Sequence, residues 1–219
     1  MIEALGYGVY THSEAAKLTG LKISRVREWF RFQLDRPEPM LRSHYEKADG
    51  ERVISFLDLV DVFVAGQLRE HGVSLQNLRK VYKKLSIDLD SLHPFSRQEL
   101  LSDGKTVFSR GLTAKGQEQI REVLTGQGVF PHIIRPFLKQ IDYDYATSLA
   151  LRWHFNKDVV LDPTIYFGQP IVEEIGIPTY ILSDAYRANN ADANKVAAWY
   201  KIQPSQVLAA VHFESSLAV

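Results

Sequence analysis

The spacing of apolar residues near the N-terminus predicts two short helices. Ser13 occupies the position of an N-cap, and Gly20 the position at which Gly ends a helix in the left-handed conformation. A second N-cap candidate, Ser24, precedes a helix predicted over residues 25–32. The apolar positions of that helix fall at i, i+3 and i+4 and form one stripe for burial: Val26, Trp29 and Phe30. Two such helices with Gly in the turn are the pattern of a helix-turn-helix.

A β-hairpin is predicted to follow these helices. Proline residues at positions 37 and 39 interrupt the helical pattern. Residues 41–45 and 51–56 are then expected to pair as strands around an Asp-Gly turn within residues 47–50. Beside a helix-turn-helix, this hairpin would be the wing.

Two longer helices come next in the pattern. Ser55 is expected to cap an apolar helix that runs to Glu70, and Ser74 to cap a helix over residues 75–85. The core stripe expected for the second helix is Leu75, Leu78 and Tyr82. The cations near its end, at positions 79, 80, 83 and 84, suit either the helix dipole or DNA.

Residues 89–140 read as a connector that could carry a dimer contact. A hairpin is predicted over residues 99–109, around Asp103-Gly104, and a helix over residues 113–124. A short helix or turn is expected at residues 132–135, between two prolines.

From residue 141 the pattern changes to short strands and then to three helices. Strands are expected within residues 141–144, 149–153, 159–163, 167–172 and 176–179. Helices are expected over residues 180–187, 192–200 and 205–213, with Thr179 and Asp192 as the first two N-caps. The core stripe expected for the second of these helices is Val196, Trp199 and Tyr200. The predicted fold class is mainly α with small β-hairpins (α+β), in three segments: residues 1–88, 89–140 and 141–219.

The free face of the second predicted helix carries arginines. A helix with an aromatic buried face and an Arg-rich free face can enter the major groove of DNA, where Arg reaches guanine edges or phosphates. A solvated helix face is the alternative interpretation. The residues expected to contact DNA from the helix are Ser24, Arg25, Arg27 and Arg31, and those expected from the wing are Arg42 and Lys47.

Composition limits the remaining chemistry. Of 219 residues, 26 are Lys or Arg, 26 are Asp or Glu and none is Cys, which excludes disulfides and thiolate metal sites. Residues 141–219 carry five cations against nine acidic residues, net −4, while the preceding segments are mildly basic. This asymmetry indicates two surfaces with different partners, or else chance. The sequence shows neither a signal peptide nor an apolar run of membrane-spanning length, which predicts a cytoplasmic protein without a membrane partner.

Enzymatic chemistry is disfavoured. The seven His residues are scattered without ligand spacing, and no nucleophile motif or phosphate loop appears. Asp142 and Asp144 share a face of a predicted strand, where they fit a solvated edge better than a cation site. We therefore expect no catalytic residues, no metal and no cofactor.

Residues 8–86 resemble the winged helix-turn-helix of the MerR family of regulators. The resemblance is carried by the order of elements and by the runs at residues 54–59 and 68–79, above all the Gly-Val-Ser-Leu step at residues 72–75. It implies a DNA-binding head that reads paired half-sites as a homodimer. The chain departs from the family in having no Cys for metal sensing and no long heptad helix at residues 86–110.

Residues 158–214 resemble VapB-type antitoxins, in a family catalogued as domain of unknown function 433. The matching runs are residues 161–163, 167–172, 176–179, 196–200 and 204–211. The resemblance implies a partner, a toxin of the PIN-like ribonuclease kind encoded beside the antitoxin. An Arg that many members carry after the central turn is missing at residues 175–177. The residues expected to contact the partner are Phe167, Gln169, Ile177, Tyr180, Tyr186 and Arg187.

Together these patterns predict an antitoxin of a type II toxin–antitoxin system. The head would bind operator DNA and repress its own operon, while the C-terminal segment would neutralise the toxin. The alternative is a stand-alone MerR-like transcription regulator whose C-terminal half senses a ligand or forms a dimer. A further alternative places DNA binding on residues 205–213, where only Lys195 and Lys201 lie nearby in the sequence.

Overall fold

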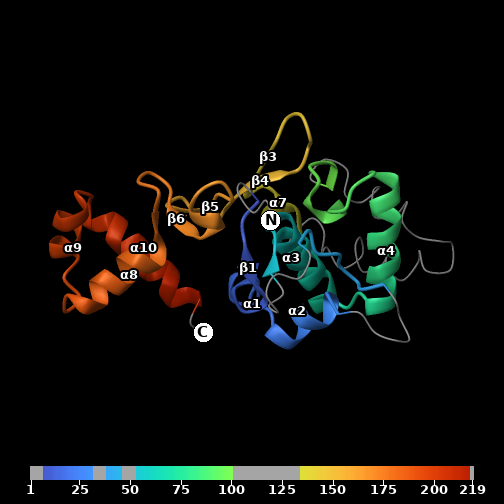
Figure 1. The fold of residues 1–219 in the computed structure, drawn as a ribbon, viewed down its shortest axis with the longest axis horizontal. Coiled ribbons are helices and arrows are strands. Elements are labelled where there is room, and N and C mark those ends of the chain that lie inside the picture. Colours follow the sequence, from blue (N-terminus) through green and yellow to red (C-terminus); the bar gives the residue numbers. More distant parts are fainter. Residues whose placement is uncertain (1–6, 32–37, 46–52, 101–133, 218–219) are drawn as a thin grey trace. The chain divides into compact units, whose positions relative to one another are not determined.

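A computed structural model describes residues 7–31, 38–45, 53–100 and 134–217 (Figure 1). The chain divides into two compact units, residues 10–150 and residues 1–9 with 151–219. Within the described residues, eight α-helices and a five-stranded sheet make a mixed α+β fold, which confirms the predicted class at that level. The assignment of separate functions to residues 1–88, 89–140 and 141–219 stays a prediction.

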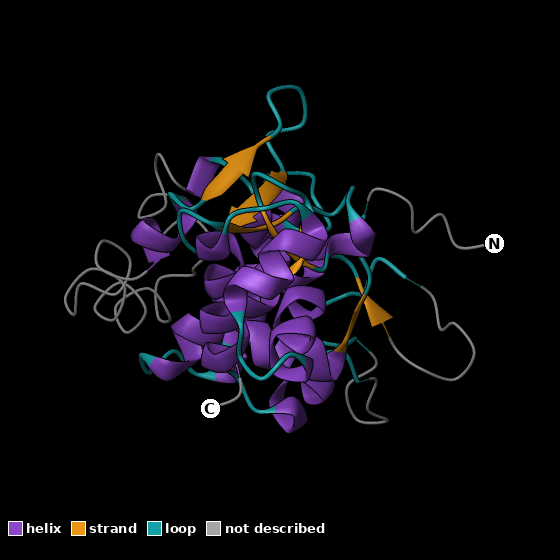
Figure 2. Cartoon of the chain, turned by 90° about the vertical axis from the view of Figure 1, so that its left-hand side faces the viewer, coloured by secondary structure: helices purple, strands orange, loops and turns teal. Residues whose placement is uncertain are grey.

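Helices are the main element of the described residues (Figure 2), and they make up most of the first unit. In chain order its elements are β1 (Tyr10–Thr11), α1 (His12–Thr19), α2 (Ile23–Trp29), β2 (Val53–Ile54), α3 (Phe56–Glu70), α4 (Leu75–Asp88), the 3-10 helix η1 (Pro94–Ser96), α7 (Arg135–Leu138) and β3 (Ile141–Tyr143).

Helix α1 begins earlier than the sequence predicts. Thr11, not Ser13, is its N-cap: the Thr11 hydroxyl accepts a hydrogen bond from the Glu14 amide at 3.1 Å, and the Glu14 carboxylate accepts one from the Thr11 amide at 2.7 Å. This reciprocal capping box satisfies two amides at once, so it outcompetes Ser13. The predicted end is confirmed, because Gly20 adopts the left-handed conformation with φ 71°.

Helix α2 also differs from its prediction at both ends. It starts at Ile23 with Lys22 as an N-cap that makes no side-chain hydrogen bond, so Ser24 lies inside the helix. It ends at Trp29 rather than at residue 32, because the carbonyl of Trp29 accepts hydrogen bonds from the amides of Met40 and Leu41 at 3.0 and 3.1 Å. The predicted buried stripe is confirmed, with Val26, Trp29 and Phe30 all 5% exposed or less.

The predicted wing hairpin is wrong in its pairing. Strand β2 pairs antiparallel with β1, the strand that precedes α1, and places Tyr10 opposite Ile54. Both side chains are fully buried, so this pairing contributes to the core. Residues 41–45 form no strand and approach β2 through a side chain, since the Ser43 hydroxyl donates to the carbonyl of Val53 at 3.1 Å. The predicted turn at residues 47–50 lies outside the described residues.

Helices α3 and α4 confirm their predicted caps. The hydroxyl of Ser55 accepts from the amide of Asp58, and that of Ser74 from the amide of Asn77. Helix α4 continues three residues beyond the predicted end, to Asp88.

The connector is described only in part. Residues 101–133, with most of the predicted hairpin and the whole helix at 113–124, lie outside the described residues. Near the predicted helix or turn at residues 132–135 stands α7, which begins at Arg135. Its Phe137 ring stacks on Phe63 of α3 with 3.8 Å between centroids.

The sheet and three helices make up most of the remaining elements. The sheet has the order β3-β4-β5-β6-β7, with β4 (Ala150–His154), β5 (Val159–Leu161), β6 (Pro170–Val172) and β7 (Ile177–Pro178) in antiparallel register. These strands fall where the sequence predicts them. The 3-10 helix η4 (Tyr166–Gly168) precedes β6, and α8 (Thr179–Ala188), α9 (Ala193–Tyr200) and α10 (Pro204–Leu217) lie together in Figure 1. Their shared core includes Val172, Leu182, Val196, Val207 and Ala210.

Two expectations for these helices are wrong. Thr179 does not cap α8, because its buried hydroxyl contacts the Glu214 carboxylate of α10 and the carbonyl of Pro170. Of the three residues expected in the core stripe of α9, only Val196 is buried. The small core that α8, α9 and α10 share is already filled by side chains from α8 and α10. Trp199 is 60% exposed and Tyr200 37% exposed. The cap at Asp192 is confirmed by its hydrogen bond from the Lys195 amide at 3.0 Å.

Candidate functional site

The turn between α1 and α2 is fixed by close packing on α3. Leu21, 7% exposed, lies in this turn directly after Gly20. A Cβ atom added at Gly66 of α3 would stand 2.7 Å from Cδ1 of Leu21, closer than two carbon atoms can approach. Glycine at position 66 therefore lets the turn seat against α3. The result is a supported pair of short helices with the dimensions of a helix-turn-helix.

The outward face of α2 is polar and mainly cationic. Lys22, Ser24, Arg27 and Glu28 are exposed, and so is Arg31 just after the helix. Arg25 is half-buried, and its guanidinium lies 3.9 Å from the carboxylate of Glu70 at the end of α3. Of the residues predicted to contact DNA, four thus share one short segment, Ser24, Arg25, Arg27 and Arg31.

Of the two residues predicted to contact DNA from the wing, Arg42 and Lys47, only Arg42 lies among the described residues. Arg42 is exposed and forms an ion pair with Glu38 at 3.4 Å, four residues before it. Lys47 lies outside the described residues. The segment that carries Arg42 is tied to α2 through the two hydrogen bonds on the Trp29 carbonyl.

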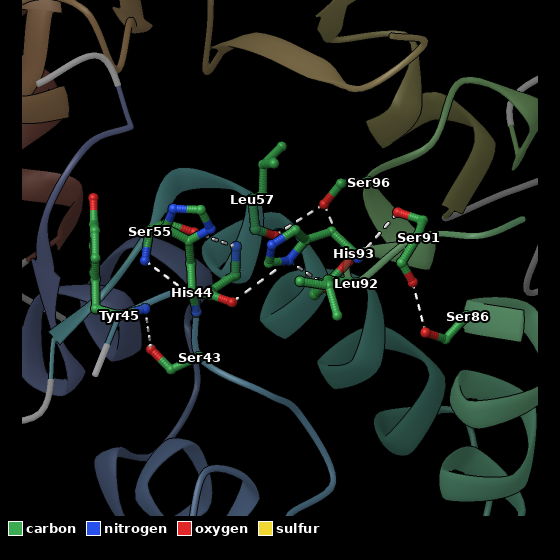
Figure 3. A network of polar contacts seen from close by, with 12 residues as sticks. Ser43, His44, Tyr45, Ser55, Leu57, Ser86, Ser91, Leu92, His93 and Ser96 are labelled. Carbon is green, nitrogen blue, oxygen red and sulfur yellow. Dashed lines mark hydrogen bonds and ion pairs between the residues drawn. The ribbon is translucent and has the colours of Figure 1, made fainter. Parts of the chain in front are cut away.

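A buried polar cluster that was not predicted from the sequence is formed by Asp58 and Asp61 of α3 with His93, the last of which is labelled in Figure 3. Each aspartate is 1% exposed and His93 is 5% exposed. The Asp58 carboxylate accepts hydrogen bonds from the amides of Ser55 at 2.8 Å and His44 at 3.0 Å. Asp58 thereby caps α3 and holds the segment that follows Arg42.

Asp61 connects α3 to α4 and to η1. Its carboxylate accepts hydrogen bonds from the Tyr82 hydroxyl at 2.8 Å and from the Ser96 hydroxyl at 3.1 Å. The Tyr82 hydroxyl also lies 2.7 Å from the carbonyl of Leu92, and the Ser96 hydroxyl 2.9 Å from that of Leu57. Each hydroxyl has one proton for two acceptors, so this part of the cluster is short of donors.

The His93 ring lies against both aspartates. Its Nδ1 lies 3.5 Å from Oδ1 of Asp58 and 3.4 Å from Oδ2 of Asp61. Burial alone would lower the pKa of His93, but the adjacent Asp61 and Asp58 carboxylates outweigh it and raise this pKa above its ordinary value. Burial raises the pKa of Asp58, and His93 opposes that shift. Burial also raises the pKa of Tyr82 well above its ordinary value.

The cluster ties several elements of the first unit together. It joins the segment after Arg42, the start of α3, α4 and η1 through charged hydrogen bonds, which are stronger than neutral ones in a buried setting. One signal in the sequence points to it: Asp58 and Asp61 stand three residues apart in the otherwise apolar run at residues 56–66 and so share a face of the helix. Nothing in the sequence indicates that His93, 32 residues after Asp61, is their partner.

The residues predicted to contact a protein partner all lie in the second unit. Phe167 lies within the 3-10 helix η4 and Gln169 directly follows it. Ile177 lies on β7, and Tyr180, Tyr186 and Arg187 lie on α8. Phe167 is 58% exposed and Tyr180 46% exposed, whereas Ile177 and Tyr186 pack partly against the helical core. Arg187 is exposed and paired with Asp184. Elements α8, β6 and β7 pack together, so several of these residues are close enough to share an interface.

Within the ranges that the structure describes, no three His, Asp or Glu side chains are placed to hold a metal ion. No described helix has both the length and the apolar character that a bilayer crossing requires.

Comparison with known proteins relates the chain to one kind of protein. No family model matches the chain. A protein of Mycobacterium tuberculosis named "Putative antitoxin VapB45" is 23% identical over 218 residues, which cover 91% of this chain and 90% of the relative. The fold is similar to the crystal structure of Rv2018 from Mycobacterium tuberculosis, with a TM-score of 0.71 and 22% identity over 92% of this chain and 96% of the other. The chain is thus a distant homologue of a protein named as an antitoxin, along nearly its whole length.

Proposed function

We propose that this protein is a DNA-binding antitoxin. One observation carries the proposal: two short helices, α1 and α2, are joined by a turn that packs on α3, and α2 has an aromatic buried face. Arg27 on α2 and Arg31 just after it are exposed. Such a helix can enter the major groove, where each Arg that pairs with a guanine contributes about 1–3 kcal/mol of discrimination. In this proposal the head, of MerR-like type, represses the operon that encodes it.

The homologue named as an antitoxin supports the second half of the proposal, a cognate toxin as partner. We propose that the toxin is a PIN-like ribonuclease and that it binds the C-terminal segment, residues 141–219. The net charge of that segment, −4, is complementary to a protein whose RNA-binding groove is basic. Exposed Phe167 and Tyr180 are suited to anchor such a contact, since aromatic side chains dominate protein interfaces.

The DNA half is tested by gel shift with the DNA upstream of the chain's own reading frame. The variant Arg27→Ala/Arg31→Ala should lose the shift and keep the circular dichroism spectrum, because both side chains are exposed. Lys139→Ala/Lys157→Ala removes two exposed charges elsewhere and is the matched control. If the double Arg variant shifts the DNA as the control does, α2 does not read DNA.

The toxin half is tested by co-expression with the neighbouring reading frame. The neighbour alone should arrest growth, and the pair should grow and co-purify. The variant Phe167→Asp/Tyr180→Asp should lose the co-purification. A harmless neighbour that does not bind this chain would contradict the antitoxin proposal and leave a stand-alone regulator in its place.

Mass measurement of the purified chain tests the expected homodimer, which the reading of paired half-sites requires.

A further inference from the structure

A hollow of about 290 Å³ lies in the first unit, between the segment at residues 38–42 and helix α4. Three cationic side chains line it, Arg42, Arg79 and Lys83, together with one carboxylate, that of Glu38. This size is near the lower end for small-molecule sites. The polar cluster around Asp61 borders the hollow, since Tyr82 contributes to its wall.

Glu38 is the internal counter-ion of the hollow. Its carboxylate lies 3.3 Å from Nζ of Lys83 and 3.4 Å from the guanidinium of Arg42, and its carbonyl accepts a bond from Arg79 at 3.4 Å. All of these contacts are long and exposed, so each is weak. Nε of Arg79 is buried and has no hydrogen-bond partner among the described residues. The hollow therefore keeps a surplus of positive charge and an unused donor.

Apolar side chains complete the lining. Met40 is buried, while Ile87 and Leu92 are 68% and 57% exposed. Large aliphatic side chains beside a concave cationic site are suited to cover the apolar part of a ligand.

We propose that this hollow binds a small amphipathic anion, a molecule with one carboxylate, sulfonate or phosphate group and an apolar body. The anionic group takes the place of Glu38 between Arg42, Arg79 and Lys83. The apolar body lies against Met40, Ile87 and Leu92.

The lining favours such a molecule over the phosphate backbone of DNA. Binding to DNA phosphates is driven by several cations that together release counter-ions. In this hollow the Glu38 carboxylate stands among the cations and would repel a row of DNA phosphates. The exposed apolar side chains of Ile87 and Leu92 would have no role in contacting a DNA backbone. The inference about binding does not depend on the proposed function.

A consequence for DNA binding does rest on the proposed function. The segment that carries Glu38 and Arg42 is attached to the end of α2 through the amides of Met40 and Leu41, both on the Trp29 carbonyl. A ligand that displaces Glu38 acts on this segment and so on α2. Ligand and DNA are then coupled, each changing the affinity of the other by the same factor.

The test uses the full chain and the fluorescent anion 8-anilinonaphthalene-1-sulfonate, which combines a sulfonate with an apolar body. We expect saturable binding of one probe per chain, with N-phenyl-1-naphthylamine, which lacks the sulfonate, about tenfold weaker or worse. Lys83→Glu should weaken the sulfonate probe about tenfold, because it reverses a charge in the hollow. Lys80→Glu makes the same change on an exposed position of α4 outside the hollow, and should leave the affinity within about twofold.

An equal loss of affinity for the sulfonate probe in Lys83→Glu and Lys80→Glu would overturn the proposal, because it would show that the probe responds to net charge alone. Equal affinity for the probes with and without the sulfonate would also overturn the proposal. So would complete displacement of the sulfonate probe by equimolar inorganic phosphate. A Lys83→Glu variant that loses DNA binding but binds the probe normally would assign the cations to DNA instead. In a separate measurement, saturating probe should change the affinity for upstream DNA at least about threefold. An unchanged DNA affinity overturns the coupling, whereas a chain that binds probe but no DNA contradicts the proposed function and leaves the site intact.

Discussion

The hydroxyl of Tyr82 is the clearest place to test the buried polar cluster. Tyr82→Phe removes one oxygen and preserves the ring, including its edge-to-face contact with Phe95 at 5.1 Å. The lost group stands 2.8 Å from the Asp61 carboxylate and 2.7 Å from the Leu92 carbonyl. A hydrogen bond to a buried charge contributes about 1.5–3 kcal/mol, and no cavity of note forms. We therefore expect the free energy of unfolding to fall by about 2 kcal/mol.

Urea unfolding followed by circular dichroism at pH 7 measures this loss through the midpoint at an unchanged slope. Tyr143→Phe is the matched control, because the contact that the Tyr143 hydroxyl makes within the described residues is a long one, 3.4 Å to the Leu138 carbonyl. It should cost no more than about 0.5 kcal/mol. Combining Tyr82→Phe with Asp61→Asn should cost less than the sum of the single changes, since both remove the same bond. Equal midpoints for the Tyr82 and Tyr143 variants would refute the role given to the cluster.

Three further predictions concern stability. The pKa values of His93 and Asp58 are raised by folding, so the folded chain binds more protons and the free energy of unfolding falls as pH rises through the folded pKa of His93. His93→Gln should flatten this fall in urea midpoints measured from pH 6 to 8, and an unchanged pH dependence would contradict the assignment. Thr11→Ala should cost about 1 kcal/mol and Ser13→Ala almost nothing, and the reverse order would restore Ser13 as the cap. Gly66→Val should cost about 1–3 kcal/mol in the same assay, through its clash with Leu21, and full stability would show that the turn is not seated on α3.

The sequence predicts most helices because their signals are local. The apolar stripe of α2 and the caps at Ser55, Ser74 and Asp192 are properties of a few neighbouring residues, and all are present in the structure. The pairing of β1 with β2 is not local. It joins positions more than 40 residues apart. The Asp-Gly turn signal within residues 47–50 instead predicted pairing with the nearby residues 41–45.

In the candidate site, too, local features are predicted from the sequence and long-range contacts are not. The exposure of Arg27 and Arg31 follows from helical spacing, whereas the Glu70 partner of Arg25 comes from the distant end of α3 and depends on the fold. Trp199 was expected in the core because of its position on an apolar stripe, but three short helices have too little interior to bury every aromatic side chain. The Asp58–Asp61–His93 cluster combines a readable spacing with a distant partner that only the fold brings near.

The salt dependence of DNA binding tests the central claim most directly. Fluorescence anisotropy with labelled upstream DNA gives the affinity at several salt concentrations, and the slope of log affinity against log salt counts the phosphate contacts. If Arg27 and Arg31 both meet the backbone, Arg27→Ala/Arg31→Ala should reduce that slope by about two. If they read bases, the double variant should instead lose its preference for upstream DNA over an unrelated duplex. A double variant that keeps both the slope and the preference of the unmodified chain would contradict the claim that α2 is the DNA-reading helix.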